Sequence, residues 1–524
     1  MPLRHFGYLV RTGVRLDPDD TSAAFALRDT MSSLWLDRQR IRIEDQPLEE
    51  YDDVVVGAGL TGLTTALLLA RGGRSVVVLE ARHVGAGATG NTTGKVSLLQ
   101  GTKLSTMLQF QSRTVVESYL TANLEGQAWL LRFCETHAVP FQVRDAVTYA
   151  PDAGSGLRSA RAEYEAASSL GLDVRWDVRL PVPFPHAGAA VLPDQAQLDA
   201  MDVLDALVQQ LRAHGGHIVE GRRVVAVSRR GRPVVTLSDG TRVPSRTVVL
   251  ATGVPTLDRG LYFAKVEAKR SYALALAHAE PPNLMMLSAG PPSRSIRDAP
   301  GPDGTPRLLV GGEGHGVGRV RSEKEHVERL RSWTQEFYPD AVETHAWSAQ
   351  DYSSHDGLPY VGPLPRGGGD IYLATGYDKW GMTNAVASAL DLAGQILGEA
   401  PSWAKPVHRR VTRPRGALRL GRMNADVVVA AATGLGAAEL RPPPEAAPDA
   451  GHADVGRVGV RPVGTSNVDG QICSVVALCT HLGGALKWND AESSWDCPLH
   501  GSRFAASGEV LEGPATTPLH RAEG

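Results

Sequence analysis

Residues 51–80 read YDDVVVGAGLTGLTTALLLARGGRSVVVLE, and this stretch decides the fold. An apolar strand that begins at Tyr51 is followed by a helical segment at 60–71 and by a second apolar strand that ends at Glu80. Strand, helix and strand in this order, with a glycine-rich turn between the first two, form the mononucleotide-binding unit of doubly wound sheets. The stretch therefore predicts a Rossmann-type α/β domain.

The turn GAGLTG at 57–62 has the spacing of a dinucleotide-binding loop. Gly57 permits the tight turn, Gly59 lets the backbone approach a pyrophosphate, and Gly62 lets helix and strand pack closely. The helix N-terminus faces the phosphates, and Glu80 is placed to hold ribose hydroxyls. A glycine-rich turn without a ligand is the alternative, but the strand, the helix and the acid together favour a bound dinucleotide. This pattern does not by itself separate FAD from NAD.

A Gly- and Thr-rich loop, ARHVGAGATGNTTGKVS at 81–97, follows Glu80. Its small side chains suit a backbone that runs beside an extended cofactor, although a flexible surface loop has a similar composition. Two other glycine-rich stretches, at 311–318 and 434–436, are not followed by a βαβ unit, so we expect one dinucleotide. The residues of the loop that we expect at the cofactor are Ala81, Arg82, Ala88, Thr89, Thr93, Gly94 and Lys95.

Two short loops near the C-terminus each combine one cysteine with one histidine. They are Cys479-Thr-His481 and, 15 residues later, Cys497-Pro-Leu-His500. A [2Fe-2S] cluster with two thiolates on one iron and two imidazoles on the other needs this pairing. A zinc site is the main alternative, but zinc motifs usually place two cysteines together and two histidines together. We therefore expect a Rieske-type cluster whose histidine ligands are partly exposed and are the site at which electrons enter or leave.

The bulk properties favour a small-molecule partner. The 524 residues are too many for one core, so two or three domains are expected. The 54 basic and 57 acidic residues are mixed along the chain, so no nucleic-acid partner is expected. No apolar stretch approaches the roughly 20 residues of a membrane span, and the N-terminus does not read as a secretory signal. The four cysteines are too few for a disulfide framework, and a cytoplasmic location is expected.

From about Ser33 to its end, the chain resembles the D-amino-acid-oxidase-like flavoproteins, such as glycine, sarcosine and γ-glutamylputrescine oxidases, in a subgroup with a C-terminal Rieske domain. Beyond the loop at 57–62, the resemblance depends on PDQAQLDA at 193–200, WSAQDY at 347–352, HDGLPYVG at 355–362 and ATGYDKWGMTNAVASALDLAGQILG at 374–398. It implies FAD as the dinucleotide. The implied FAD contacts are Val224, beside the adenine, and Thr252, Gly253, Trp380, Gly381, Met382 and Thr383.

The C-terminal part resembles Rieske domains through CTHLGG at 479–484, WNDAESSWDCPLHGSRF at 488–504 and EGPATTPL at 512–519. High-potential respiratory Rieske proteins have disulfide cysteines where this chain has Gly484 and Leu499, and a tyrosine that hydrogen-bonds a ligand sulfur where it has Phe504. The missing donor predicts a potential below the top of the Rieske range. Some superfamily members attach FAD through cysteine or histidine. Neither residue occurs where it is needed near WGMT or in TGNTTG, so we expect non-covalent FAD.

Composition and resemblance together predict the domain organisation and the fold class. We expect a Rossmann-type FAD-binding domain of α/β type, interleaved with an antiparallel-sheet α+β substrate domain and followed by a small all-β Rieske domain. Met31 is an alternative translation start within the N-terminal extension. The expected parts are an extension at 1–45, an oxidoreductase at 46–422 (FAD-binding about 46–105, 190–265 and 350–400; substrate part about 106–189 and 266–349) and a Rieske domain at 423–524.

The resemblance implies oxidation of a C–N bond in an amine or amino-acid-like substrate, with electrons relayed through the cluster or passed to oxygen. Lys95 is a candidate to stabilise negative charge on the flavin, and Tyr272, His315 and Asp351 are candidates for the substrate pocket. Each of these side chains has a purely structural alternative. A ferredoxin or a quinone is a candidate one-electron partner. Two other functions stay open: a flavin reductase or monooxygenase that receives electrons through the cluster, and a Rieske unit that is only a docking or structural module.

Overall fold

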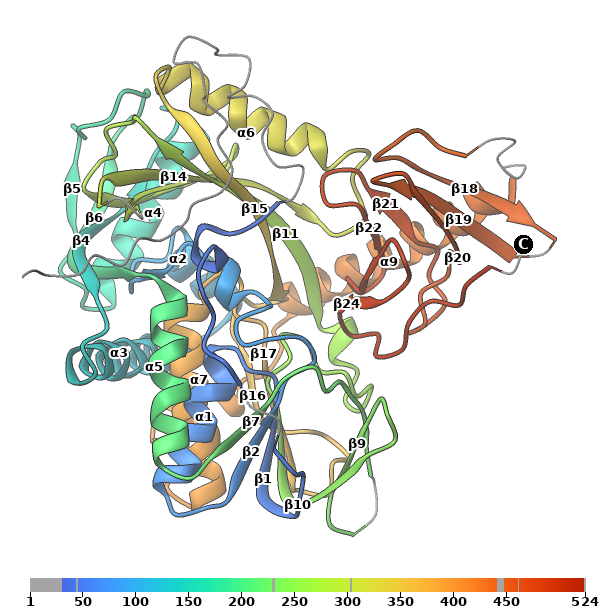
Figure 1. Cartoon of the computed structure of the whole chain (residues 1–524). Helices are drawn as coiled ribbons and strands as arrows, with labels where there is room; N and C mark the ends of the chain where they lie inside the picture. The colour runs from blue at the N-terminus through green and yellow to red at the C-terminus, as the bar shows by residue number, and fades with distance from the viewer. Residues whose placement is uncertain are drawn as a thin grey trace, which may run out of the picture.

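A computed structural model of the chain describes residues 31–43, 46–228, 231–301, 304–440, 447–459 and 461–522. Of the predicted extension only 31–43 is described, and it holds the short 3₁₀ helix η2 (Leu34–Leu36). Two sheets stand one above the other, and the C-terminal strands lie beside the upper one (Figure 1). No helix of these described segments is long and apolar enough to cross a membrane.

The predicted βαβ unit is confirmed as β1 (Tyr51–Val56), α1 (Leu60–Arg71) and β2 (Val76–Leu79). All residues of β2 and nearly all of α1 are buried, which explains their continuous apolar runs. β1 pairs in parallel with β2 on one side and with β10 on the other. The sheet order is β16-β17-β10-β1-β2-β7, with β8 and β9 attached at β10. Its other strands are β7 (His217–Val219), β8 (Val224–Val227), β9 (Val234–Leu237), β10 (Arg242–Leu250), β16 (Tyr360–Pro363) and β17 (Ile371–Thr375).

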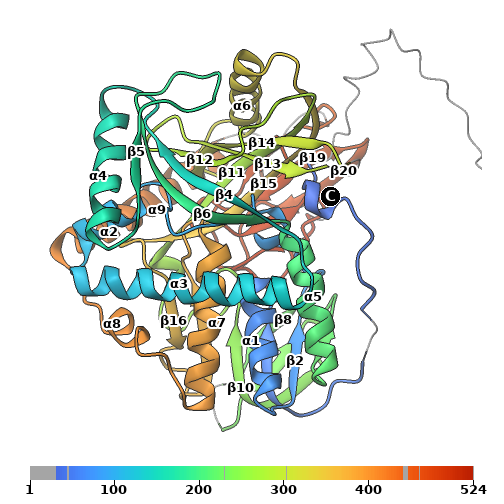
Figure 2. The same ribbon diagram turned by 90° about the vertical axis from the view of Figure 1, so that its left-hand side faces the viewer.

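Helices cover one face of this mainly parallel sheet. α5 (Ala200–Ala213), α1 and α7 (Gly381–Leu397) lie side by side on it, and α3 (Arg113–Thr136) crosses them (Figure 2). Gly126 of α3 allows the close crossing with α7, because a Cβ there would lie 2.6 Å from the carbonyl oxygen of Thr383. Two further helices, α2 (Lys103–Phe110) and α4 (Ser155–Ser169), pack on each other, and the 3₁₀ helices are η3 (Thr89–Asn91) and η4 (Tyr262–Ala264).

The second sheet is mainly antiparallel, as predicted for the substrate domain. Its order is β15-β11-β14-β13-β12-β4-β6-β3, with β5 paired to β6, and α6 (Lys324–Phe337) contacts it at β14 and β11. Long strands at one edge, β11 and β15, reach down toward the parallel sheet (Figure 1). The strands are β3 (Lys95–Val96), β4 (Phe141–Tyr149), β5 (Arg175–Asp177), β6 (Ala189–Leu198), β11 (Val266–Ala277), β12 (Leu284–Ser288), β13 (Arg294–Pro300), β14 (Pro306–Gly316) and β15 (Val342–Ser354).

The C-terminal part is built of two small antiparallel sheets. The first has the order β18-β19-β20 and the second β21-β22-β23-β24. The domain boundary expected between 422 and 423 falls inside α9 (Pro414–Leu440), a helix that follows α8 (Ala404–His408). The strands are β18 (Ala453–Val458), β19 (Arg461–Val468), β20 (Gln471–Val476), β21 (Lys487–Asn489), β22 (Ser494–Asp496), β23 (Arg503–Ala505) and β24 (Val510–Glu512).

Candidate active site and cluster-binding loops

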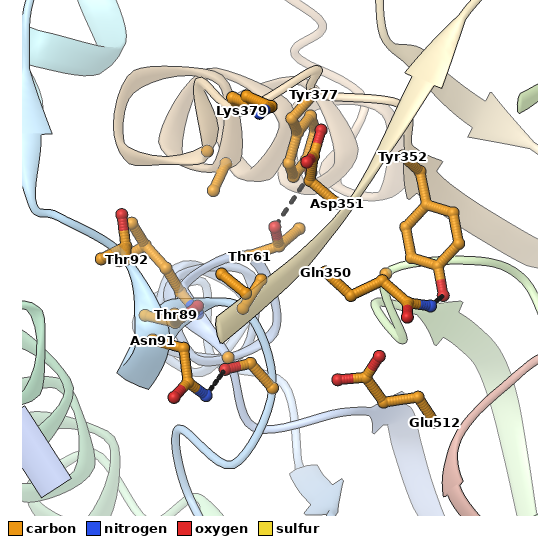
Figure 3. A pocket seen from close by; sticks show the side chains of 18 of the residues that line it. Thr61, Thr89, Asn91, Thr92, Gln350, Asp351, Tyr352, Tyr377, Lys379 and Glu512 are labelled. Atoms are coloured by element: carbon orange, nitrogen blue, oxygen red, sulfur yellow. Dashed lines mark hydrogen bonds between the residues drawn. The ribbon is translucent and has the colours of Figure 1, made fainter. Parts of the chain in front are cut away.

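A cavity of about 510 Å³ opens where the two sheets meet. Its walls come from the turn after β1, the loop at 81–97, the sheet strands β11 and β15, and the residues that precede and begin α7. Leu511, Glu512 and Gly513 of the C-terminal part complete the lining. Glu512 is labelled in Figure 3. Residues from all three parts of the chain therefore enclose one space of the size that small-molecule sites have.

The turn after β1 has the conformation that a dinucleotide-binding loop requires. Gly57 has a φ of +106°, and a Cβ there would lie 2.5 Å from the carbonyl oxygen of Ala251. A Cβ at Gly62 would lie 1.9 Å from the carbonyl oxygen of Gly57, so only glycine lets α1 approach the turn. Gly59 caps α1 without a side chain, and the Leu60 N–H donates to the Thr89 hydroxyl at 3.2 Å. Gly59, Leu60 and Thr61 line the cavity, so the N-terminus of α1 faces it.

Glu80 holds the turn together and faces the same cavity. Its two carboxylate oxygens accept hydrogen bonds from the backbone N–H of Ala58 at 2.9 Å and of Arg82 at 2.8 Å. A carboxylate has about four lone-pair sites, so both oxygens can still accept a hydroxyl proton. The turn, the helix start and this acid together fit the pyrophosphate and ribose of a dinucleotide.

Most of the cofactor residues predicted from the sequence line the cavity. Three do not: Gly62, Gly94 and Thr383. Gly94 packs against the carbonyl of Leu198, and Thr383 is buried in a hydrogen-bonded group with Gln100 and Asn123. Those that line it are Gly57, Gly59, Glu80, Ala81, Arg82, Ala88, Thr89, Thr93, Lys95, Val224, Thr252, Gly253, Trp380, Gly381 and Met382.

Of the four predicted catalytic residues, three line the cavity and one lies behind its wall. Lys95 and Tyr272 line the cavity, and Nζ of Lys95 donates to the hydroxyl of Ser295. Burial, together with Arg297, holds the pKa of Lys95 well below its usual range. His315 lies outside the lining: its Nε2 is 3.1 Å from the Tyr272 hydroxyl, and its ring packs on His326 of α6. Burial lowers the pKa of His315 to about 4, so the ring is neutral near pH 7.

Asp351 of β15 is the unusual group in the cavity wall. Both carboxylate oxygens are buried, and neither has a hydrogen-bond partner in the part of the chain that the structure describes. Burial raises the pKa of Asp351 to about 6, against the opposing effect of Lys379. Two other lysines near Asp351 pair with other carboxylates, Lys103 with Asp378 and Lys269 with Glu267. A buried carboxylate without a donor is costly unless a ligand supplies one.

Sequence reasoning missed several polar side chains of the cavity. Gln350 and Tyr352 are on the same strand as Asp351, and Lys379 belongs to the same motif as Trp380. All three lie in sequence motifs on which the family resemblance depends. Their position beside Asp351 and Trp380 is therefore the sequence signal that could have identified them. Glu512 lies opposite, on the C-terminal part (Figure 3).

The two Cys/His loops come together at one end of the C-terminal part. The buried side chains of Cys479 and Cys497 lie in one packed cluster, and the rings of His481 and His500 are 5.2 Å apart. Nδ1 of His500 is buried without a hydrogen-bond partner among the described residues. Thiols on one side and imidazoles on the other fit the two irons of a [2Fe-2S] cluster.

The expected exposure of these histidines is wrong. His500 is only 9% exposed, and the His481 side chain only 6%. Phe263 of η4 lies against both rings, with centroids 5.2 Å from His481 and 4.7 Å from His500. The imidazole face is covered because the C-terminal part packs against the segment between β10 and β11, a contact between segments far apart in the sequence.

Buried polar contacts join the C-terminal part to the cavity wall. Nε2 of Gln350 donates to the carbonyl of Gly501 at 2.8 Å and to the Tyr352 hydroxyl at 2.9 Å. Arg270 of β11 forms a buried ion pair with Glu492. Although burial alone would raise the pKa of Glu492, Arg270 and Arg503 hold it well below its usual range. Gln350, whose side chain lies between the cluster loop and the cavity, is therefore held by hydrogen bonds to Gly501 and Tyr352.

Comparison with known proteins agrees with this geometry. The family model described as FAD dependent oxidoreductase, DAO, matches residues 52–395. The chain belongs to this family. A Rieske [2Fe-2S] domain model matches residues 449–523, so the DAO-type enzyme carries a Rieske domain after its flavoprotein part. The cofactors are accordingly FAD and a [2Fe-2S] cluster.

Relatives of this DAO-type oxidoreductase share the architecture. A Bacillus subtilis (strain 168) protein, YhfW, named for a Rieske 2Fe-2S centre, is 31% identical over 479 residues, which cover 90% of this chain and 93% of that protein. Glycine oxidase from Geobacillus kaustophilus aligns with a TM-score of 0.57 and 20% identity over 68% of this chain and 96% of its own. L-Amino acid deaminase from Proteus myxofaciens aligns with a TM-score of 0.56 and 15% identity over 72% and 97%. The two structural similarities show the shared fold.

Proposed function

We propose that this protein oxidises the C–N bond of an amine or amino-acid-like substrate and passes the electrons within the chain to its Rieske cluster. The observation that carries the proposal is the position of Gln350. Its side chain lines the cavity and also hydrogen-bonds Gly501, the residue that follows the cluster ligand His500. A module that served only for docking would not need its cluster loop at this wall.

The residues that we propose to hold FAD are the predicted ones that line the cavity. Gly57 and Gly59 let the backbone and the start of α1 approach the pyrophosphate, and Glu80 accepts from the ribose. Val224 and the segment at 380–382 line the same cavity. Bound FAD supplies acceptance of a hydride and release of the two electrons one at a time.

Two ionisable groups of the cavity suit the proposed substrate. Asp351 offers two buried acceptor oxygens without a donor, which fits the cationic nitrogen of an amine. Lys95 has a depressed pKa, and negative charge that develops in the cavity would favour its protonated form. Tyr272 is held by His315 and forms part of the wall. Asp351 therefore binds substrate, and Lys95 balances charge.

The proposed reaction is a two-electron oxidation of the substrate followed by hydrolysis of the product. The substrate would lose a hydride from carbon, which bound FAD would accept, and a proton from nitrogen, which would pass to water, and an imine results. Water then hydrolyses the imine to a carbonyl compound and an amine or ammonia. The two electrons leave in two single-electron steps to an external carrier, for which a ferredoxin-like protein or a quinone is our candidate.

The test is anaerobic mixing of the full chain, with both cofactors loaded, with a panel of amines and amino acids. We expect at least one compound to bleach the flavin absorbance and to give the EPR signal of the reduced cluster. Bleaching without the cluster signal would show that the relay is wrong. Failure of every compound, together with cluster reduction by a reduced ferredoxin, would show that electrons enter in the opposite direction.

A further inference from the structure

The flavoprotein part supplies the residues that touch the histidine ligands of the cluster. The segment between β10 and β11 carries Asp258 and, in η4, Phe263. Phe263 stacks edge-on against both imidazoles, whose own rings meet at 81°. The imidazole pair is therefore enclosed by a surface that is not part of the Rieske domain.

Asp258 makes the polar contact with this pair. Its Oδ1 lies 2.8 Å from Nε2 of His481. A carboxylate only accepts, so the imidazole N–H donates. The described residues include no other carboxylate that hydrogen-bonds His481 or His500, so the Rieske domain itself contributes none.

A hydrogen bond from a ligand imidazole to a carboxylate has a defined effect on a metal centre. It fixes the orientation of the ring and makes the ring a stronger electron donor to the metal. Stronger donation and the adjacent negative charge both stabilise the oxidised, more positive cluster. The reduction potential of the cluster falls as a result, since hydrogen bonding and charge around the ligands set this potential.

We propose that Asp258 is a positioning residue that lowers the reduction potential of the Rieske cluster through its hydrogen bond with His481. The cluster alone does not determine its potential; the docked flavoprotein part contributes to it. A change in the packing between the two parts that separated Asp258 from His481 would make the cluster a stronger oxidant.

The test is an EPR-monitored redox titration of the full chain at one pH. In Asp258→Asn the side-chain shape is retained but the charge is lost, and we expect the midpoint to shift to more positive potential. Glu267→Gln is the matched control. Glu267 is also on the flavoprotein side of the contact and pairs with Arg319, which donates to the carbonyl of Pro498, but it touches no ligand histidine. We expect little shift in this variant.

Equal midpoints in wild type and Asp258→Asn, or equal shifts in Asp258→Asn and Glu267→Gln, would overturn the proposal. Iron content and the visible spectrum establish that each variant holds the cluster. A second measurement needs no variant. Pulsed EPR of the reduced wild-type protein with ¹⁵N-histidine should show different couplings for the remote nitrogens of the two ligands, and equivalent couplings would contradict the hydrogen bond to His481 alone.

Discussion

Nε2 of Gln350 donates a 2.8 Å hydrogen bond to the carbonyl oxygen of Gly501, which adjoins the cluster ligand His500. The same side chain lines the cavity, and its oxygen accepts from Arg270. One buried amide therefore spans the distance between the FAD cavity and the cluster loop.

Replacement of Gln350 by alanine should slow electron transfer to the cluster. The variant loses the bridge to Gly501 and leaves a space in the wall, so we expect a several-fold lower rate of cluster reduction after the flavin is reduced by light. Stopped-flow or flash spectroscopy at the cluster absorbance measures this rate.

Gln100→Ala is the matched control for this rate. Gln100 also lines the cavity and is as buried as Gln350, at 3% against 4%, but it bonds Asn123 and Thr383 on the side away from the Rieske domain. We expect an unchanged rate of cluster reduction in this variant. An equal slowing in both variants would mean that general loosening of the wall is responsible.

Asp351→Asn should weaken the binding of cations in the cavity. Loss of a buried charged partner costs roughly 2 kcal/mol or more, which corresponds to about a 30-fold loss of affinity. The measurement is titration of the FAD-loaded protein with tert-butylammonium, which has N–H donors but no hydrogen on the carbon next to nitrogen that could be oxidised, followed by flavin absorbance. A carboxylate of similar size should bind the variant no more weakly than the wild type.

The affinity for this cation should also depend on pH. Burial raises the pKa of Asp351 to about 6, so the carboxylate is charged above that pH and neutral below it. We therefore expect wild-type affinity to be retained at pH 8 and to fall as the pH is lowered through about 6. The same loss in Asp351→Asn would assign the titration to another group.

Arg270→Met should destabilise the contact between the flavoprotein and Rieske parts. The substitution removes the ion pair that joins the two parts and leaves Arg503, at 3.3 Å, as the remaining ion-pair partner of the buried Glu492. A fully unpaired buried charge costs about 3–5 kcal/mol, so a smaller loss than this is expected here. We expect the thermal loss of the cluster absorbance to occur at a clearly lower temperature. In Arg222→Met, which removes an exposed pair with Asp239, the transition should move little.

The sequence was sufficient to predict elements whose pattern is local. Gly57 and Gly62 are specified by backbone geometry, and the ligands Cys479 and His481 by spacing, so both loops could be recognised. The contact of Asp258 with His481 joins residues 223 positions apart and depends on how two domains pack, which no local pattern encodes. The boundary expected at 423 falls inside α9, because a change in composition along the chain does not mark where a helix begins or ends.

Acid precipitation of the loaded protein should release FAD into the supernatant. Neither cysteine nor histidine occurs among the described residues that line the cavity, so these residues offer no attachment point of the kind used by covalent flavoproteins. The measurement is the absorbance spectrum of the supernatant and of the washed pellet. Yellow colour that stays with the pellet would contradict this prediction.

Phe504→Tyr should raise the reduction potential of the cluster. Phe504 is fully buried in the core of the Rieske domain, where it packs in one cluster with Cys479 and Cys497. A phenylalanine ring offers no hydrogen bond to a sulfur, so the wild-type potential should lie below the top of the Rieske range. The added hydroxyl would donate toward a ligand sulfur and favour the reduced cluster. Protein-film voltammetry measures both midpoints, and a wild-type value near the upper limit, or a lower value in the variant, would show that the sulfur environment does not set this potential.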